Sequence, residues 1–173
     1  MDPGEKNRKL KEQIAALRSG NRSAILETLK ALRSDGDTSV LPELYKLMLI
    51  QEDEEVLGEI AALLNDLKDK EAADSLAEAI ANLEYRKIQA PLVAACWQNG
   101  LSYGKHIATF VEVVISGSYE AAVEAFTVIE EAVGELEQEE RTALVSSLKS
   151  KLRQVEEQKK PLFAELVRSI ESY

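Results

Sequence analysis

Residues 53–80 read DEEVLGEIAALLNDLKDKEAADSLAEAI, which is an acidic turn, an apolar helix, a second acidic turn and another apolar helix. The first of these segments carries one apolar stripe at helical spacing, formed by Val56, Ile60, Leu63, Leu64 and Leu67. Adding 32 gives Ile88, Leu92, Ala95, Cys96 and Asn99, and adding a further 34 gives Ala122, Phe126, Ile129, Glu130 and Val133. Thirteen of these fifteen positions are apolar or small, which predicts a repeated helix pair.

Composition favours helix over strand throughout the chain. The 173 residues include only 8 Gly, 4 Pro and 5% aromatic residues, while 45% are hydrophobic, so one helical domain with a real core is expected. No segment approaches the roughly 18 uncharged apolar residues of a membrane span or resembles a secretory leader. The single cysteine gives no sign of an oxidising compartment. We therefore expect a cytoplasmic protein that does not bind membranes.

Turn residues divide the chain into about ten helices joined by short loops, so consecutive helices pack antiparallel. Thr38 and Ser39 are expected to cap a helix with Pro42 in its first turn, and Asn99-Gly100 reads as a helix end. Pro91 either kinks a helix that begins near Tyr85, or lies in the first turn of one that begins near Ile88.

A helix pair that repeats at such a step is typical of an α-solenoid, because each pair covers its apolar face only by stacking on the next. We predict an all-α, right-handed α-solenoid of about five antiparallel helix pairs in a single domain. Residues 1–37 would form an N-terminal cap pair, 38–134 the central repeats, and 135–173 the C-terminal capping helices. The first of these capping helices is expected to be long, with Leu152 and Val155 on its apolar stripe. Alternatively, the basic first helix or the C-terminal pair binds the acidic middle of another copy.

Three segments carry a family resemblance: VLPELYKLML (40–49), EDEEVLGEIAALLNDL (52–67) and DKEAADSLAEAIANL (69–83). They resemble the bacterial short HEAT-like repeat, an armadillo-like α-solenoid family. GSYEAAVEAF at 117–126 is similar to a tetratricopeptide helix, which is the weaker match. In HEAT-like arrays the second helix of each pair lines the concave side, and this resemblance implies a scaffold that binds proteins there.

The expected binding groove therefore lies opposite the core stripe of the second helices. Its floor is predicted to consist of Gly58, Ala62, Asn65, Ala90, Ala94, Trp97 and Val128, with a rim of Glu55, Glu59, Gln89, Glu124 and Glu131. Aromatic anchors carry most interface energy, so Trp97 is the central candidate, although it could instead pack as ordinary core. The sequence predicts a non-enzymatic module that binds a partner's peptide or helix in an acidic and apolar groove.

Charge and motif content argue against other functions. The chain carries −10 overall, and nine glutamates but no Lys or Arg lie between Lys105 and Arg141, a pattern that repels nucleic acid. His106 is the only histidine and is expected on the surface, whereas Cys96 lies on the core stripe, so no catalytic, metal or cofactor site is predicted. The alternative is a HEAT-like enzyme or enzyme subunit, because some members of that family resemble this chain and act as bilin lyases.

Overall fold

The computed structural model describes residues 2–35 and 37–173. Within these residues the chain is all-helical and contains no strand, which confirms the predicted class. The helices are α1 (Pro3–Arg18), α2 (Arg22–Asp35), α3 (Leu41–Ile50), α4 (Glu54–Asn65), α5 (Glu71–Ala81), α6 (Gln89–Asn99), α7 (Ile107–Ser116), α8 (Tyr119–Val133), α9 (Gln138–Lys151) and α10 (Lys160–Glu171). Short 3-10 helices in the connections span Thr38–Val40, Leu83–Ile88, Gly104–His106, Leu152–Gln154 and Glu157–Lys159.

Several helix ends follow the turn chemistry of the sequence. Asp53 caps α4 by accepting hydrogen bonds from the backbone N–H groups of Glu55 and Val56 at 3.0 and 3.1 Å. Gly100 ends α6 in the left-handed conformation, with φ at 66°. An exception is the expected cap at Thr38 and Ser39. These residues begin a 3-10 helix that Asp37 caps instead, because its side chain accepts from the N–H of Ser39.

Pro91 lies in the first turn of α6, which begins at Gln89. The missing N–H of a proline at this position would have no intrahelical partner in any case. The 3-10 helix Leu83–Ile88 fills the preceding connection, so α6 starts late and no proline kink is needed.

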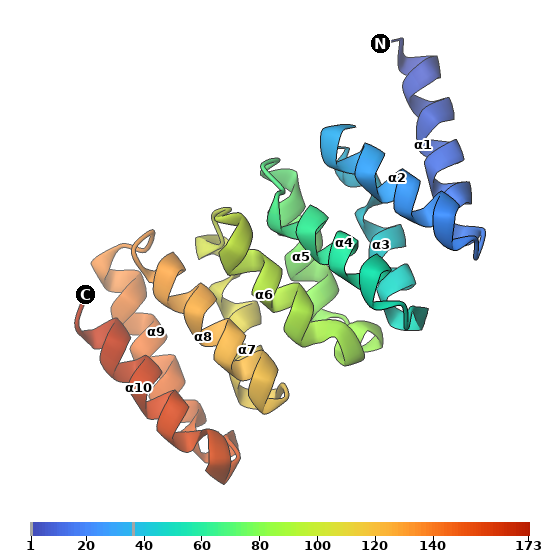
Figure 1. The fold of residues 1–173 in the computed structure, drawn as a ribbon. Helices are drawn as coiled ribbons and strands as arrows, with labels where there is room; N and C mark the ends of the chain where they lie inside the picture. The colour runs from blue at the N-terminus through green and yellow to red at the C-terminus, as the bar shows by residue number, and fades with distance from the viewer. Residues whose placement is uncertain (1, 36) are drawn as a thin grey trace.

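The helices form two layers (Figure 1). In the even layer α2 packs on α4, α4 on α6, α6 on α8 and α8 on α10, while in the odd layer α1 packs on α3, α3 on α5 and α5 on α7. Polar side chains also join neighbouring even helices. Arg22 pairs with Asp53, 31 residues away, and Asn65 with Gln98, 33 residues away. These two hydrogen bonds link α2 to the start of α4, and α4 to α6.

The core lies between the layers and contains the predicted stripes of α4 and α6 in full. Leu44, Leu76 and Phe110 of the odd layer are also fully buried, and they follow one another at steps of 32 and 34 residues. Asn99 is the one polar member of the α6 stripe, and its amide donates to the Leu64 carbonyl and to the Tyr103 hydroxyl.

The predicted stripe of α8 is confirmed at Ala122, Ile129 and Val133, which are buried, but it is wrong at two positions. Phe126 and Glu130 are only half-buried, whereas the buried residues of α8 include Ala121, Ala125, Val128, Ile129 and Ala132. This set follows the α6 stripe at a step of 33, not 34. One residue turns an α-helix by about 100°, so the smaller step moves the centre of the buried face of α8 toward Ala125 and Val128.

The last helix pair also differs from its prediction. A long helix was expected to run through Val155, but α9 ends at Lys151 and two short 3-10 helices follow. Leu152, which the stripe placed in the core, is exposed, while Val155 is buried. Lys159 then anchors the connection, because its Nζ donates to the carbonyls of Ile115 and Gly117 at 2.7 and 2.9 Å.

Candidate functional site

Trp97 lies at the seam between α6 and α8, on the outer side of the even layer. The side chain keeps 37% of its surface exposed, and its indole Nε1–H donates to Glu124 Oε2 at 2.7 Å. Long side chains on a helix lean toward its N-terminus, which explains why Trp97 meets Glu124 and not a residue one turn further along α8. A tryptophan that is exposed yet held in place by a charge-assisted hydrogen bond presents a fixed apolar surface.

Small residues surround the indole on its own helix and on α4. Ala62, Ala90 and Ala94 are half-buried and Gly58 is exposed, so most of the predicted floor residues share this outer surface. Asn65 also lies here, and its amide Nδ2 donates to Gln98 Oε1 at 2.8 Å, which links α4 to α6.

Two of the predicted groove residues do not lie on this surface. Val128 is 1% exposed and belongs to the core stripe of α8, because that stripe follows the α6 stripe at the shorter step. Gln89 is buried as well, and its Nε2 donates to the carbonyl of Ile80 at the end of α5. Their side chains fill the interior and cannot contact a partner on the outer surface.

Val123 takes the place that was assigned to Val128. It is 40% exposed on α8, and it follows Ala90 at the same shorter step, in register with the predicted floor. A repeat step of 33 residues from α6 to α8, in place of 34, would have identified Val123 from the sequence. We call the resulting surface the Trp97 face, formed by Gly58, Ala62, Asn65, Ala90, Ala94, Trp97, Val123, Glu124 and Glu131.

Carboxylates dominate the helices that carry this face. The α4, α6 and α8 segments contain seven glutamates and no Lys or Arg, and α6 between them carries no charged residue at all. On the α4 side, Glu55 pairs with Arg22, and Glu59 lies 3.9 Å from Arg33, so cations of α2 neutralise this part of the rim.

The α8 side of the rim is not neutralised in this way. Glu124 is bonded to Trp97, and Glu120 and Glu131 are exposed and form no ion pair with any described residue. The acidic character of the Trp97 face is therefore concentrated along α8, next to the indole.

His106 and Cys96 lie in the odd layer and in the core, respectively. His106 was expected on the surface, but it is half-buried. Its Nε2 lies 2.6 Å from Asp74 Oδ1. Lys105 Nζ lies 2.7 Å from the same oxygen. The hydrogen bond from Lys105, followed by that from His106, holds the pKa of Asp74 below its ordinary value. This cluster links α5 to the start of α7.

Cys96 is buried as predicted, and burial raises its pKa to about 12. The side chain is therefore a thiol at neutral pH, and a thiol is a poor nucleophile. Among the residues that the structure describes, no three His, Cys, Asp or Glu side chains are grouped so that they could hold a metal ion.

Comparisons of the chain with protein-family models, with curated proteins and with solved structures give no match. The resemblance of residues 40–83 to HEAT-like repeats is therefore still a prediction. Over residues 2–35 and 37–173, no helix combines the length and the apolar character needed to span a membrane.

Proposed function

We propose that the chain is a right-handed α-solenoid of the HEAT-like kind and that it functions as a protein-interaction module. The Trp97 face is the proposed site, and the proposed partner is a helix or peptide with an apolar anchor and cationic flanks. The observation that carries this proposal is Trp97 itself, an exposed aromatic ring held by Glu124.

The layered packing supports the solenoid part of the proposal. Even helices contact even neighbours from α2 to α10, and odd helices contact odd neighbours from α1 to α7. The buried stripe of α4 recurs at nearly equal steps in α6 and in α8. In such arrays one layer stays open on its outer side, and partners bind along it.

The chemistry of the face supports the partner class. Tryptophan is among the residues that most often carry binding energy at interfaces, and a cation over the face of an indole adds about 0.5–2 kcal/mol. Glu120 and Glu131 lie on the same helix as Glu124 and pair with no cation among residues 2–35 and 37–173. A partner with Lys or Arg beside its apolar anchor would satisfy both features.

Trp97 is the only tryptophan of the chain, so its fluorescence reports on this face alone. The probe is a designed amphipathic peptide of Leu and Lys without aromatic residues. We expect it to shift the emission of Trp97 to shorter wavelength, with an affinity that falls as salt is added. A matched peptide of Leu and Glu serves as the control. No shift with the Lys peptide, or equal shifts with both peptides, would contradict the proposed partner class.

Calorimetry with the same Lys peptide tests the role of the ring. We expect Trp97→Ala to weaken binding by roughly 30-fold, equivalent to about 2 kcal/mol at a hot spot. Tyr119→Ala is the matched control, because Tyr119 is 49% exposed but lies outside the Trp97 face. Equal losses of affinity in the two variants would show that the peptide does not bind through Trp97.

A further inference from the structure

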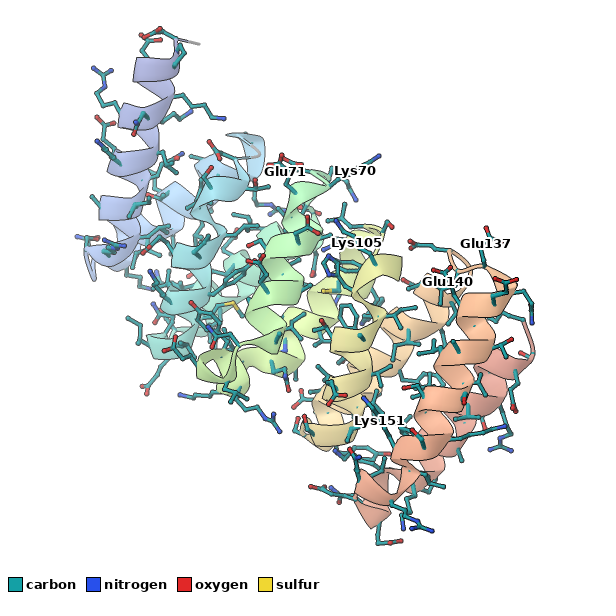
Figure 2. All side chains as sticks on the ribbon, turned by 180° about the vertical axis from the view of Figure 1, so that it is seen from behind. Lys70, Glu71, Lys105, Glu137, Glu140 and Lys151 are labelled. Carbon is teal, nitrogen blue, oxygen red and sulfur yellow. The ribbon has the colours of Figure 1, made fainter. Side chains whose placement is uncertain are left out.

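The turns that lead from odd to even helices all lie along one edge of the molecule, at the lower right in Figure 1. This follows from antiparallel helix pairs that stack in the same orientation. We call this surface the odd-to-even edge and define it by residues 18–22, 50–54, 82–88, 116–120 and 151–157. The opposite edge carries the even-to-odd turns, where Figure 2 shows the charged side chains of Lys70, Glu71, Lys105, Glu137 and Glu140.

Exposed apolar side chains are concentrated on the odd-to-even edge. Within the described residues seven large hydrophobic side chains are exposed, and four of them lie here, one on each of four successive turns: Ile50, Leu83, Tyr119 and Leu152. Ile50 and Leu83 are 80% and 77% exposed, more than any other large hydrophobic residue that the structure describes. The even-to-odd turns carry none of the seven. Single exposed hydrophobic residues are ordinary, but one per turn in a row is typical of a contact surface.

Hollows with apolar and charged residues in their walls lie beside two of these projections. One, of about 320 Å³, lies next to Ile50 between the first two helix pairs and includes Leu17, Leu47 and Val56 in its wall. The other, of about 400 Å³, lies next to Leu83 between α5 and α7 and includes Ile80 and Val113. The same edge therefore carries both projections and hollows, which is what a self-complementary contact requires.

Charge selects a second copy of this chain as the occupant. In a two-fold contact each surface meets its own copy, so a surface of one sign repels itself. The five turns of the odd-to-even edge carry six Lys or Arg and seven Asp or Glu, a net charge of −1 in a chain of −10. The Trp97 face, whose helices carry seven glutamates and no cation, would repel its copy.

The size of the edge agrees with a stable dimer. Five turns at the usual helix spacing of 8–10 Å extend over roughly 40 Å, and two layers of helices about 10 Å wide give a width of roughly 20 Å. The resulting area of roughly 800 Å² is what each partner contributes to an interface of standard size.

We propose that the protein forms a two-fold symmetric dimer through its odd-to-even edge. The proposal is independent of the Trp97 face, which stays open in such a dimer. When two rows of five turns overlap fully, the middle turn meets its own copy whichever way the symmetry axis runs. Leu83 lies on that middle turn, so Leu83 of one copy contacts Leu83 of the other.

Light scattering coupled to size exclusion tests the dimer on the full chain. We expect twice the mass of 19.2 kDa at about 100 μM, and a monomer for Ile50→Asp and for Leu83→Asp with unchanged helical circular dichroism. Val123→Asp is the matched control, because Val123 is an exposed hydrophobic residue of the Trp97 face, and it should keep the wild-type mass. A wild-type monomer would overturn the proposal, as would a dimer that only Val123→Asp dissociates.

Cross-linking tests the position of the symmetry axis. Under mild oxidation Leu83→Cys should form a disulfide between copies at least ten times faster than Val123→Cys. The native Cys96 does not interfere, since it is buried. Equal rates for the two variants would exclude contact at Leu83. If the chain proved monomeric and instead bound another protein through Ile50 and Leu83, the edge would be a contact surface but the proposed dimer would be wrong.

Discussion

Lys159 Nζ donates to the carbonyl of Ile115 at 2.7 Å from a side chain that has no exposed surface. The carbonyl of Gly117 accepts from the same ammonium at 2.9 Å. Carbonyls at a helix end lack intrahelical partners, and a cation placed there is favoured by the helix dipole. The C-terminal helix pair is thereby tied to the end of α7.

Replacing Lys159 by Ala should lower the free energy of unfolding by about 3 kcal/mol, because the change leaves a cavity and two buried carbonyls without a donor. Urea denaturation followed by circular dichroism measures the loss. Lys160→Ala is the matched control, since Lys160 is only half-buried, and it should change the free energy by less than about 0.5 kcal/mol. Equal effects of the two substitutions would show that the buried ammonium does not hold the C-terminal pair.

Gly58→Ala should raise the free energy of unfolding by about 1 kcal/mol, because alanine favours the helix interior over glycine. A Cβ at Gly58 would meet no atom within 4 Å. Thermal denaturation of the variant measures the gain, and a loss of stability would mean that the glycine is needed for packing.

Gly117→Ala should have the opposite effect to Gly58→Ala and lower the free energy of unfolding. A Cβ at Gly117 would lie 2.4 Å from the Val113 carbonyl oxygen, a backbone atom. Relief of that overlap requires the backbone to shift, which costs about 1–3 kcal/mol of stability.

Lowering the pH should destabilise the fold, partly because the carboxylate of Asp53 becomes protonated. The hydrogen bond from Arg22, and then that from the Val56 N–H, hold the pKa of Asp53 below its ordinary value. A carboxyl with a depressed pKa in the folded state contributes stability above its unfolded pKa of about 3.9, and this contribution is lost as the pH falls through the folded value.

Arg22→Gln should therefore show a smaller loss of stability between pH 6 and pH 3 than the wild type, measured as the urea midpoint. Arg153→Gln, which changes an exposed arginine that forms no ion pair with any described residue, should follow the wild-type curve. If Arg22→Gln followed that curve too, the ion pair would not contribute to the acid sensitivity.

Glu124→Ala should release the indole of Trp97. A protein with one tryptophan gives one indole N–H resonance, and loss of the charged acceptor is expected to move it upfield. The melting temperature should change little, because hydrogen bonds between exposed side chains contribute about 0–1 kcal/mol. An unchanged indole resonance in the nitrogen–proton correlation spectrum would mean that the bond to Glu124 is not formed in solution.

Local chemistry made the helices and most of their ends predictable. Asp53, Pro42 and Gly100 act within a turn or two of their own position, so the sequence identifies them directly. The buried stripes of α4 and α6 were also predictable, because burial of an apolar stripe depends on the helical period alone.

The candidate site could be predicted only in part. Gly58, Ala62, Asn65, Ala90, Ala94 and Trp97 are half-buried or exposed on α4 and α6. The sequence left open whether Trp97 is exposed, and it did not indicate the bond to Glu124. Val128 was misplaced because the repeat step into α8 is shorter by one than the sequence pattern predicted. Periodicity within one helix does not determine the rotation of the next helix about its axis.

The sequence by itself determined that the chain is helical, where most of its helices end, and which stripe of α4 and α6 is buried, since backbone hydrogen bonding and the helical period are local properties. Only the tertiary structure decided the rotation of α8, the fixed exposure of Trp97 at the α6–α8 seam, and the alignment of Ile50, Leu83, Tyr119 and Leu152 along one edge. These features depend on how helices pack against their neighbours, and packing joins residues far apart in the chain whose relation no local pattern encodes.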